Sequence, residues 1–216
     1  MNKYKIAIFD MDGTILDTLN DIYNAINHAL VMFGLPARTR EEIRMFVGNG
    51  LRKLTERAVP AGTDSETIDK VLAELLKYYG EHSYDTTAPY DGINQVIAAL
   101  HSKGIVTAVV SNKADFAVQI LAEKFFDGLF DFAIGEHTGF APKPAPDMVN
   151  EILSRAGIAR EDAVYIGDSD VDILTANNSS MDCIAVAWGF RDVEFLKAHN
   201  ATVIALEPKD LLDMIY

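Results

Sequence analysis

The sequence has few of the residues that stabilise secreted or zinc-binding proteins. Its 216 residues include one cysteine, Cys183, so no disulfide can form within the chain. The five histidines are scattered, and none lies at the spacing of a metal-binding motif. A chain without disulfides fits a reducing compartment, and we expect the protein to be cytoplasmic.

Long apolar runs and an excess of positive charge are also missing. No run reaches the roughly 18 apolar residues of a membrane helix, and the first apolar segment begins too early for a signal peptide to precede it. Acidic residues number 32 against 19 basic ones, which gives a net charge of −13. Because such a surface repels a nucleic-acid backbone, we expect neither a nucleic-acid nor a membrane partner.

The most informative stretch that is present is residues 6–14, IAIFDMDGT. Its apolar half is typical of a β-strand buried on both faces, as in a parallel sheet. Residues two apart point the same way in an extended chain, so Asp10 and Asp12 would project together from the end of the strand. Open α/β sheets bind ligands at that end. Two carboxylates this close predict either a bound cation or a retained proton.

A helical segment interrupts the chain after this strand. Residues 18–86 show helical patterns without a strand signal, and Thr18 with Asp21 and Thr39 with Glu42 have the spacing of capping boxes. From residue 89 onward, helices and strands alternate, which predicts a parallel, doubly wound sheet. The strands are expected at 105–110, 130–134, 163–166, 183–187 and 202–205.

The predicted fold is therefore α/β. A three-layer, Rossmann-like core domain would comprise residues 1–16 and 87–216, because the first strand must share the sheet to bury both of its faces. Residues 17–86 would form an α-helical cap domain inserted after the first strand.

Residues able to do chemistry follow four of the expected strands. Because the carboxyl ends of parallel strands meet at one edge of a sheet, these residues should share one face. They supply acids, a hydroxyl, a lysine and further acids, in this order: Asp10, Asp12 and Thr14; Ser111, Asn112 and Lys113; Lys143; and Asp168, Ser169, Asp170 and Asp172.

With these segments in this order, the sequence resembles the haloacid dehalogenase-like superfamily, and within it the phosphoglycolate phosphatase-like branch. The resemblance extends through the whole chain and is looser in the cap. It implies a magnesium-dependent phosphatase that hydrolyses a small phosphorylated metabolite through an aspartyl phosphate. The matching segments are Asp10-Met11-Asp12-Gly13-Thr14, Ser111-Asn112-Lys113, Lys143-Pro144-Ala145-Pro146 and Gly167-Asp168-Ser169-Asp170-Val171-Asp172.

The resemblance also implies catalytic and metal-binding roles. Asp10 would attack the phosphoryl group, and Asp12 would protonate the leaving oxygen and later deprotonate water. That division requires Asp12 to be neutral near pH 7 while Asp10 stays ionised. Mg²⁺ would be held by Asp10, Asp168 and the backbone carbonyl of Asp12, and Asp172 would support the metal from outside its ligand shell.

Phosphate binding is implied for four further residues. Ser111 would donate a hydrogen bond to a phosphoryl oxygen together with backbone amides near Asn112, and Lys143 would pair with both the phosphate and Asp10. Thr14 would brace the loop that carries the two acids.

Substrate choice is expected from the cap, where glycines flank Asn49 and precede Arg52. The glycines allow the backbone to approach a ligand, and Arg52 is a candidate clamp for a carboxylate. The alternative interpretation is a plain helix start followed by solvated cations.

Three other functions remain open at this point. A β-phosphoglucomutase-like mutase and a pyrophosphatase of the same family would use the same core segments. The non-enzyme alternative is a phosphoaspartate signalling or magnesium-binding protein. A signalling receiver domain is about half as long and has its phosphorylated aspartate on a middle strand, whereas here the paired acids open the chain.

Overall fold

The apolar segment predicted as the first strand forms β1 (Ile6–Phe9) in the middle of a six-stranded sheet. The computed structural model describes residues 3–216, and its sheet has the order β5-β4-β1-β6-β7-β8 with every pairing parallel. The other strands are β4 (Val106–Ala114), β5 (Phe132–Glu136), β6 (Ala163–Gly167), β7 (Asp182–Val186) and β8 (Ile204–Ala205).

Both faces of the sheet are covered, as the continuous apolar run predicted. Ala7 and Phe9 of β1 pack in one cluster with residues of α5, α6 and α10, whereas Ile6 and Ile8 pack in another with residues of α7 and α8. The predicted three-layer α/β fold is thereby confirmed. Its helices are α5 (Ile93–Ser102), α6 (Asp115–Phe126), α7 (Asp147–Ala156), α8 (Asp170–Asn178), α9 (Val193–Ala198) and α10 (Asp210–Ile215), with a short 3-10 turn η1 (Arg160–Asp162).

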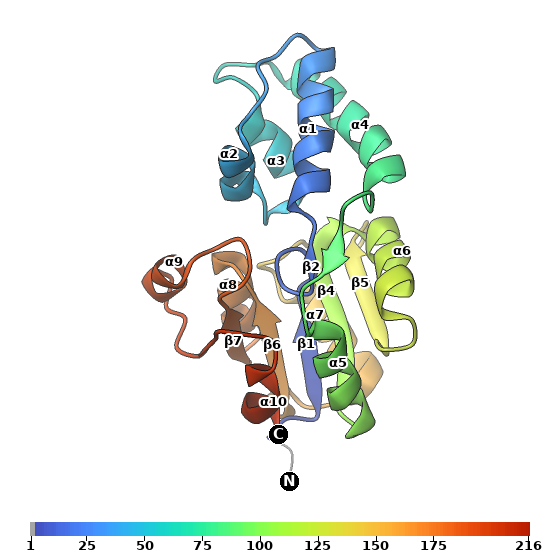
Figure 1. Ribbon diagram of the computed structural model, residues 1–216, viewed down its shortest axis with the longest axis vertical. Coiled ribbons are helices and arrows are strands. Elements are labelled where there is room, and N and C mark those ends of the chain that lie inside the picture. Colours follow the sequence, from blue (N-terminus) through green and yellow to red (C-terminus); the bar gives the residue numbers. More distant parts are fainter. Residues whose placement is uncertain (1–2) are drawn as a thin grey trace.

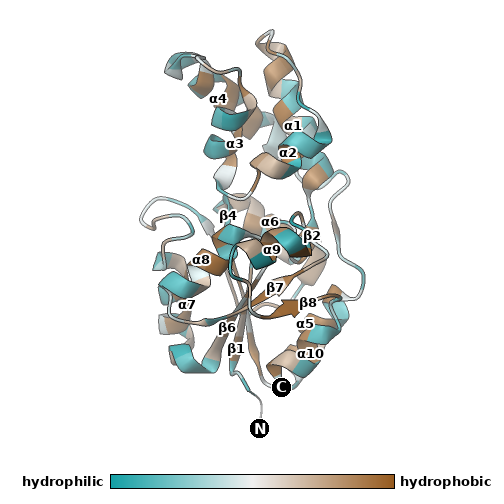
Figure 2. Ribbon diagram, turned by 90° about the vertical axis from the view of Figure 1, so that its left-hand side faces the viewer, coloured by the Kyte–Doolittle hydropathy of each residue, from teal (hydrophilic) through white to brown (hydrophobic). Residues whose placement is uncertain are grey.

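Four helices form a separate bundle above the carboxyl ends of the strands (Figure 1). We call this bundle the cap; it comprises α1 (Leu19–Met32), α2 (Arg40–Phe46), α3 (Gly50–Ala58) and α4 (Ser65–His82). It has its own hydrophobic cluster, to which a single core residue, Phe190, contributes. Figure 2 shows the bundle standing over the sheet, with hydrophilic and hydrophobic residues alternating along its helices, as expected for helices with one buried face. None of the helices within residues 3–216 is long and apolar enough to span a bilayer.

Two short strands that the sequence did not predict join the cap to the sheet. β2 (Leu16–Asp17) and β3 (Ala88–Pro89) pair antiparallel, so the chain enters and leaves the cap side by side. These strands lie next to the domain boundaries predicted at residues 16/17 and 86/87, and the division into two domains stays a prediction. Strands of two residues carry too little periodicity to be detected in a sequence.

One predicted capping box is confirmed and the other is wrong. Thr39 Oγ1 accepts a hydrogen bond from the Glu42 amide at 3.2 Å, and Glu42 Oε2 accepts from the Thr39 amide at 2.7 Å. Thr18 makes no such bond at the start of α1. The reason lies in Asp21, whose carboxylate is used elsewhere.

Asp21 ties the outgoing link of the cap to the start of α1. Its buried carboxylate accepts from the amides of Thr86 and Thr87 at 3.0 and 2.8 Å, and from their hydroxyls at 2.6 and 2.7 Å. A carboxylate with this many donors is strongly stabilised. Asp21 therefore holds the segment by which the chain leaves the cap next to the start of α1, where the chain enters it.

Replacing Asp21 tests this link. Asp21→Ala leaves the amides of Thr86 and Thr87 without their acceptor. We therefore expect the free energy of unfolding to fall by roughly 2–4 kcal/mol. Urea denaturation followed by circular dichroism measures the change. Asp127→Ala, which removes an exposed carboxylate, is the matched control and should change stability by less than about 0.5 kcal/mol. Equal effects of the two substitutions would contradict the role given to Asp21.

Candidate active site

The two acids that follow β1 are placed by a tight turn against Asp168. Gly13 has a φ of +84°, and a Cβ atom at this position would collide with the Asp168 carboxylate. Glycine is therefore required on both conformational and steric grounds. The turn leaves Asp10 and Asp12 in the lining of a cavity between the sheet and the cap.

Three buried carboxylates gather around Lys143. Oxygens of Asp10, Asp168 and Asp172 all lie within 4.8 Å of one another. Lys143 Nζ is 2.9 Å from Asp10 Oδ1 and 2.8 Å from Asp172 Oδ1. The lysine thus neutralises one of the three negative charges and leaves the cluster anionic.

The titration of these groups reflects their burial. Burial raises the pKa of Asp10 to about 6, although the attraction of Lys143 opposes the rise. Burial, together with repulsion from Asp172 and Asp10, raises the pKa of Asp168 well above its ordinary value. Burial alone would lower the pKa of Lys143, but Asp10 and Asp172 hold it well above the usual range.

Asp172 is the least free of the three acids. Its Oδ1 binds Lys143, and its Oδ2 accepts from the amide and the hydroxyl of Ser169 at 3.0 and 2.6 Å, which caps α8. Asp168 Oδ2 accepts from the Phe190 amide at 2.7 Å, and no hydrogen bond to its Oδ1 is seen within residues 3–216. Asp10 and Asp168 are accordingly the carboxylates able to bind a metal, with Asp172 holding Lys143 beside them.

Asn112 positions Lys143 through its backbone. The Lys143 amide donates to Asn112 Oδ1 at 2.7 Å, and Asn112 Nδ2 donates to the Lys143 carbonyl at 3.0 Å and to the Gly48 carbonyl of the cap at 3.2 Å. The side chain predicted to be near the phosphate is therefore engaged with the lysine loop and the cap. The neighbouring Ser111 lines the cavity, and its Oγ accepts a hydrogen bond from the Lys113 amide at 3.3 Å.

The structure shows which group of Thr14 braces the turn, and a role in phosphate binding stays a prediction. Its side chain is fully buried, Oγ1 has no hydrogen-bond partner among the described residues, and Thr14 does not line the cavity. The turn is instead braced by its carbonyl, which accepts from Trp188 Nε1 at 2.9 Å. The packing of the turn, which a sequence does not reveal, decides which group of Thr14 is used.

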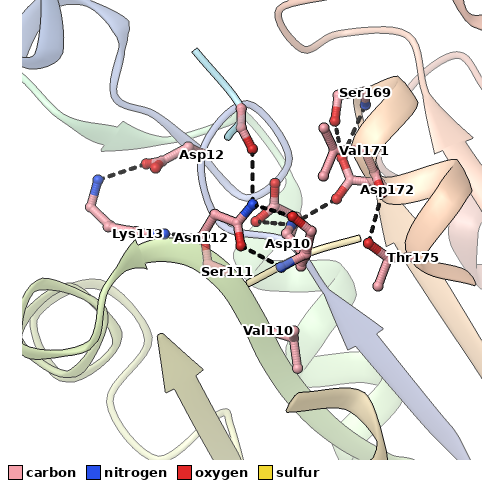
Figure 3. A network of polar contacts seen from close by, with 12 residues as sticks. Asp10, Asp12, Val110, Ser111, Asn112, Lys113, Ser169, Val171, Asp172 and Thr175 are labelled. Carbon is pink, nitrogen blue, oxygen red and sulfur yellow. Dashed lines mark hydrogen bonds and ion pairs between the residues drawn. The ribbon is translucent and has the colours of Figure 1, made fainter. Parts of the chain in front are cut away.

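Lys113, which the sequence left without a role, is bound to Asp12 and to the cap. Its buried Nζ lies 2.8 Å from Asp12 Oδ1 and also contacts the Tyr79 hydroxyl of α4. Figure 3 shows Asp12 and Lys113 on one side of Asp10, with Ser169 and Asp172 on the other. Burial lowers the pKa of Lys113 by itself, but Asp12 and Tyr79 raise it above the ordinary value. Burial raises the pKa of Tyr79 to about 12, so its hydroxyl keeps its proton at neutral pH.

β4 is longer than predicted, and this places Lys113. The expected strand ended at residue 110, whereas β4 continues through Ala114 with a register shift after Val110. Because β4 continues to Ala114, Lys113 lies within the strand, and its side chain reaches Asp12 and Tyr79. The polar sequence from Ser111 masked this continuation.

A loop after β7 fastens the cap over the site. Phe190 packs into the cap's hydrophobic cluster, and its carbonyl accepts from Arg44 Nε at 2.6 Å. The guanidinium of Arg191 donates to the carbonyls of Arg44, Met45 and Val47 at 2.6, 3.3 and 3.1 Å. A cation at the last turn of α2 also satisfies its dipole. Neither residue was predicted to link cap and core.

The two cap residues predicted to contact substrate do not line the cavity. Arg52 is exposed and pairs with Asp69 at 2.5 Å, and Asn49 accepts from Arg57 at 2.8 Å. The flanking Gly48 and Gly50 do line the cavity, so the backbone approaches the site while the side chains turn outward. A role for the Asn49 and Arg52 side chains in substrate binding stays a prediction.

Removing Arg191 tests the contact between cap and core. In Arg191→Ala the last carbonyls of α2 lose a charged donor, a loss on the order of 1.5–3 kcal/mol. Amide hydrogen exchange in residues 40–47 should then accelerate about tenfold or more, as seen by mass spectrometry. Arg155→Ala, which removes an exposed arginine paired within α7, is the control. Unchanged exchange in residues 40–47 would show that Arg191 does not hold the cap.

The chain is similar to known hydrolases over most of its length. A family model of haloacid dehalogenase-like hydrolases matches residues 7–186. The chain is 30% identical to phosphoglycolate phosphatase 1 of Pseudomonas aeruginosa, over 96% of this chain and 78% of that one, and 29% identical to the phosphoglycolate phosphatase of Aliivibrio fischeri, over 98% and 96%. A crystal structure of a candidate phosphoglycolate phosphatase from Lactobacillus delbrueckii subsp. bulgaricus superimposes with a TM-score of 0.94 at 42% identity, covering 99% of this chain and 98% of that one. The predicted resemblance is confirmed, and the chain belongs to the haloacid dehalogenase-like hydrolase family.

Proposed function

We propose that this protein is a Mg²⁺-dependent phosphatase that hydrolyses a small phosphomonoester, such as phosphoglycolate, through an aspartyl phosphate on Asp10. The observation that carries the proposal is the grouping of Asp10 with Lys143 and Asp168 at a cavity that also holds Asp12. Relatives named phosphoglycolate phosphatase support a phosphoric monoester hydrolase.

The carboxylate cluster fits a divalent cation. Oxygens of three buried acids lie within 4.8 Å of one another beside Lys143, and hard oxygen donors with excess negative charge suit Mg²⁺. Asp10, Asp168 and the backbone carbonyl of Asp12 would hold it. When bound, Mg²⁺ neutralises charge on the phosphoryl oxygens and so reduces their repulsion of an attacking carboxylate.

The chain's own residues would carry out two displacements. In the first, an Asp10 oxygen forms a bond to phosphorus while the bond from phosphorus to the leaving oxygen breaks, and Asp12 gives that oxygen a proton. In the second, Asp12 takes a proton from water as the water oxygen attacks phosphorus. The bond between phosphorus and Asp10 then breaks, which releases inorganic phosphate and restores Asp10.

Lys143 and Ser111 would hold the transferring group. Lys143 is buried behind the cavity lining and pairs with Asp10 at 2.9 Å, so its ammonium would attract a phosphoryl oxygen bound at Asp10, and Ser111 lines the cavity itself. Asn112 would act through Lys143, since its side chain holds both backbone groups of that lysine.

The cap side of the cavity disfavours a sugar-phosphate mutase. Its lining there includes Ile22, Val47, Leu51 and Leu54, whereas a hexose would need hydrogen-bonding partners for its hydroxyls. A small leaving group fits such walls better.

Metal removal and an isosteric substitution test the reaction. We expect Mg²⁺-dependent release of inorganic phosphate from phosphoglycolate, lost on addition of EDTA and restored by excess Mg²⁺. Asp10→Asn should lower kcat by at least about 10³-fold because the nucleophile is removed. The exposed Asp213→Asn is the matched control and should keep wild-type activity. Wild-type protein that releases phosphate from no phosphoester would refute the proposed function.

Asp12 can be tested separately by its two roles. Asp12→Asn keeps the shape of the side chain but can neither donate nor accept the catalytic proton, so formation and hydrolysis of the aspartyl phosphate should each slow by roughly 10²–10⁴-fold. Rapid-quench kinetics resolves the two steps. If only one step slows, Asp12 does not serve both proton transfers.

A further inference from the structure

Charged side chains are scarce in the part of the cavity that would surround the leaving group. The cap side of the lining is apolar, and the lining residues with a positive charge are Lys113 and Arg191. The acids Asp10, Asp12 and Asp168 give the opposite wall a negative charge. An anionic substituent on the leaving group would therefore need one of these two cations to bind here.

Arg191 is already committed to the cap. Three backbone carbonyls near the end of α2 accept hydrogen bonds from its guanidinium at 2.6 to 3.3 Å. Turning this group toward a ligand would leave those carbonyls without their donor. Arg191 Nε has no hydrogen-bond partner among the described residues, but the guanidinium cannot turn toward a ligand without breaking the bonds that its terminal nitrogens make to those carbonyls. Arg191 therefore serves the contact with the cap, and Lys113 is the better candidate to bind substrate.

Lys113 lies beside Asp12, and one of its N–H groups is available to donate a hydrogen bond to a ligand. An ammonium has three N–H donors, and within residues 3–216 the hydrogen bonds of Lys113 Nζ go to Asp12 Oδ1 and the Tyr79 hydroxyl. Nζ also lies 4.8 Å from the centroid of the Tyr79 ring. Asp12 is the residue proposed to protonate the leaving oxygen. A cation 2.8 Å from its carboxylate consequently lies beside the alcohol part of the substrate, on the side of Asp10 away from Asp172 (Figure 3).

Tyr79 fixes the ammonium at this place. Its side chain is fully buried in the cap and lines the cavity, so Lys113 is held between core and cap and has little freedom to follow a larger ligand. Leu51 and Leu54 of α3 border the same space. These walls favour a short leaving group whose anionic end lies near the phosphoester.

We infer that Lys113 is a specificity-determining residue, which binds an anionic group on the leaving side of a small phosphoester, with Tyr79 holding it in position. The inference rests on the proposed function and adds the residue that distinguishes substrates. The anionic group can be a carboxylate, as in phosphoglycolate, or a second phosphate, as in pyrophosphate. An uncharged leaving group of similar size, as in ethyl phosphate, gains nothing from Lys113.

The test compares kcat/KM for phosphoglycolate, pyrophosphate and ethyl phosphate in the wild type and in Lys113→Met. The wild type should prefer at least one of the anionic substrates to ethyl phosphate. A lost charge-assisted hydrogen bond corresponds to about a 10- to 100-fold effect, so Lys113→Met should reduce that preference by this factor. The substrate that loses the preference identifies the anionic group. Lys113→Arg keeps the charge and should retain part of the preference.

Two outcomes overturn the inference. Equal losses on charged and uncharged substrates would mean that Lys113 only positions Asp12, and a wild type without preference would mean that no anionic group is bound. Neither outcome contradicts the proposed function. That proposal fails only if the protein hydrolyses no phosphoester. If Lys113→Met does not fold by circular dichroism, Tyr79→Phe replaces it. That variant removes the hydroxyl that holds Lys113 and should lower the same preference through KM; an unchanged preference would equally overturn the inference.

Discussion

The ion pairs that Lys143 makes with Asp10 and Asp172 are the constraint on which the rest of the site depends. A buried ammonium is tolerated only when it is paired, and here its two partners come from the turn after β1 and the first turn of α8. Asn112, at the end of β4, fixes the lysine's backbone. Lys143 thereby connects the carboxyl ends of β4, β1 and β6, which are neighbours in the sheet. Without it, three carboxylates within 4.8 Å would repel one another at the point where the reaction is proposed to occur.

The short loop after β7 connects the same edge of the sheet to the cap. The Phe190 amide binds Asp168, the Phe190 ring packs in the cap, and Arg191 satisfies the end of α2. Any movement of the cap away from the sheet must therefore break contacts made by residues adjacent to a proposed metal ligand. Lys113 and Tyr79 form a second connection, next to Asp12. Closing the cap and arranging the acids are consequently linked events, since both use the same contacts.

The sequence was sufficient for the parts of the fold that depend on local pattern. The run before Asp10 predicted a strand buried on both faces, and the alternation after residue 89 predicted the parallel sheet. The four strand-end segments predicted which residues meet. Lys143 was expected to pair with Asp10, and the structure brings the two within 2.9 Å.

What the sequence missed depends on tertiary contacts. Nothing local distinguishes Arg191 from a solvated arginine, because its partners are backbone carbonyls almost 150 residues away in the chain. Asp21 had the spacing of a capping box, but the amides and hydroxyls of Thr86 and Thr87 bind it instead. Arg52 had the chemistry to bind a carboxylate, yet the orientation of α3 turns it toward Asp69. The contact of Lys113 with Asp12 could be predicted only if the strand were expected to continue past Val110. The polar residues from Ser111 onward argued against such a continuation.

Covalent phosphorylation of Asp10 during turnover is the step that sets the proposed reaction apart, and it can be detected by trapping. Wild-type protein is mixed with ³²P-labelled phosphoglycolate and Mg²⁺, quenched in acid within milliseconds and digested for mass spectrometry. The account predicts an acid-stable, alkali-labile label on the peptide that contains Asp10, which is absent in Asp10→Asn. Turnover without a labelled peptide, or a label on any other residue, would contradict it.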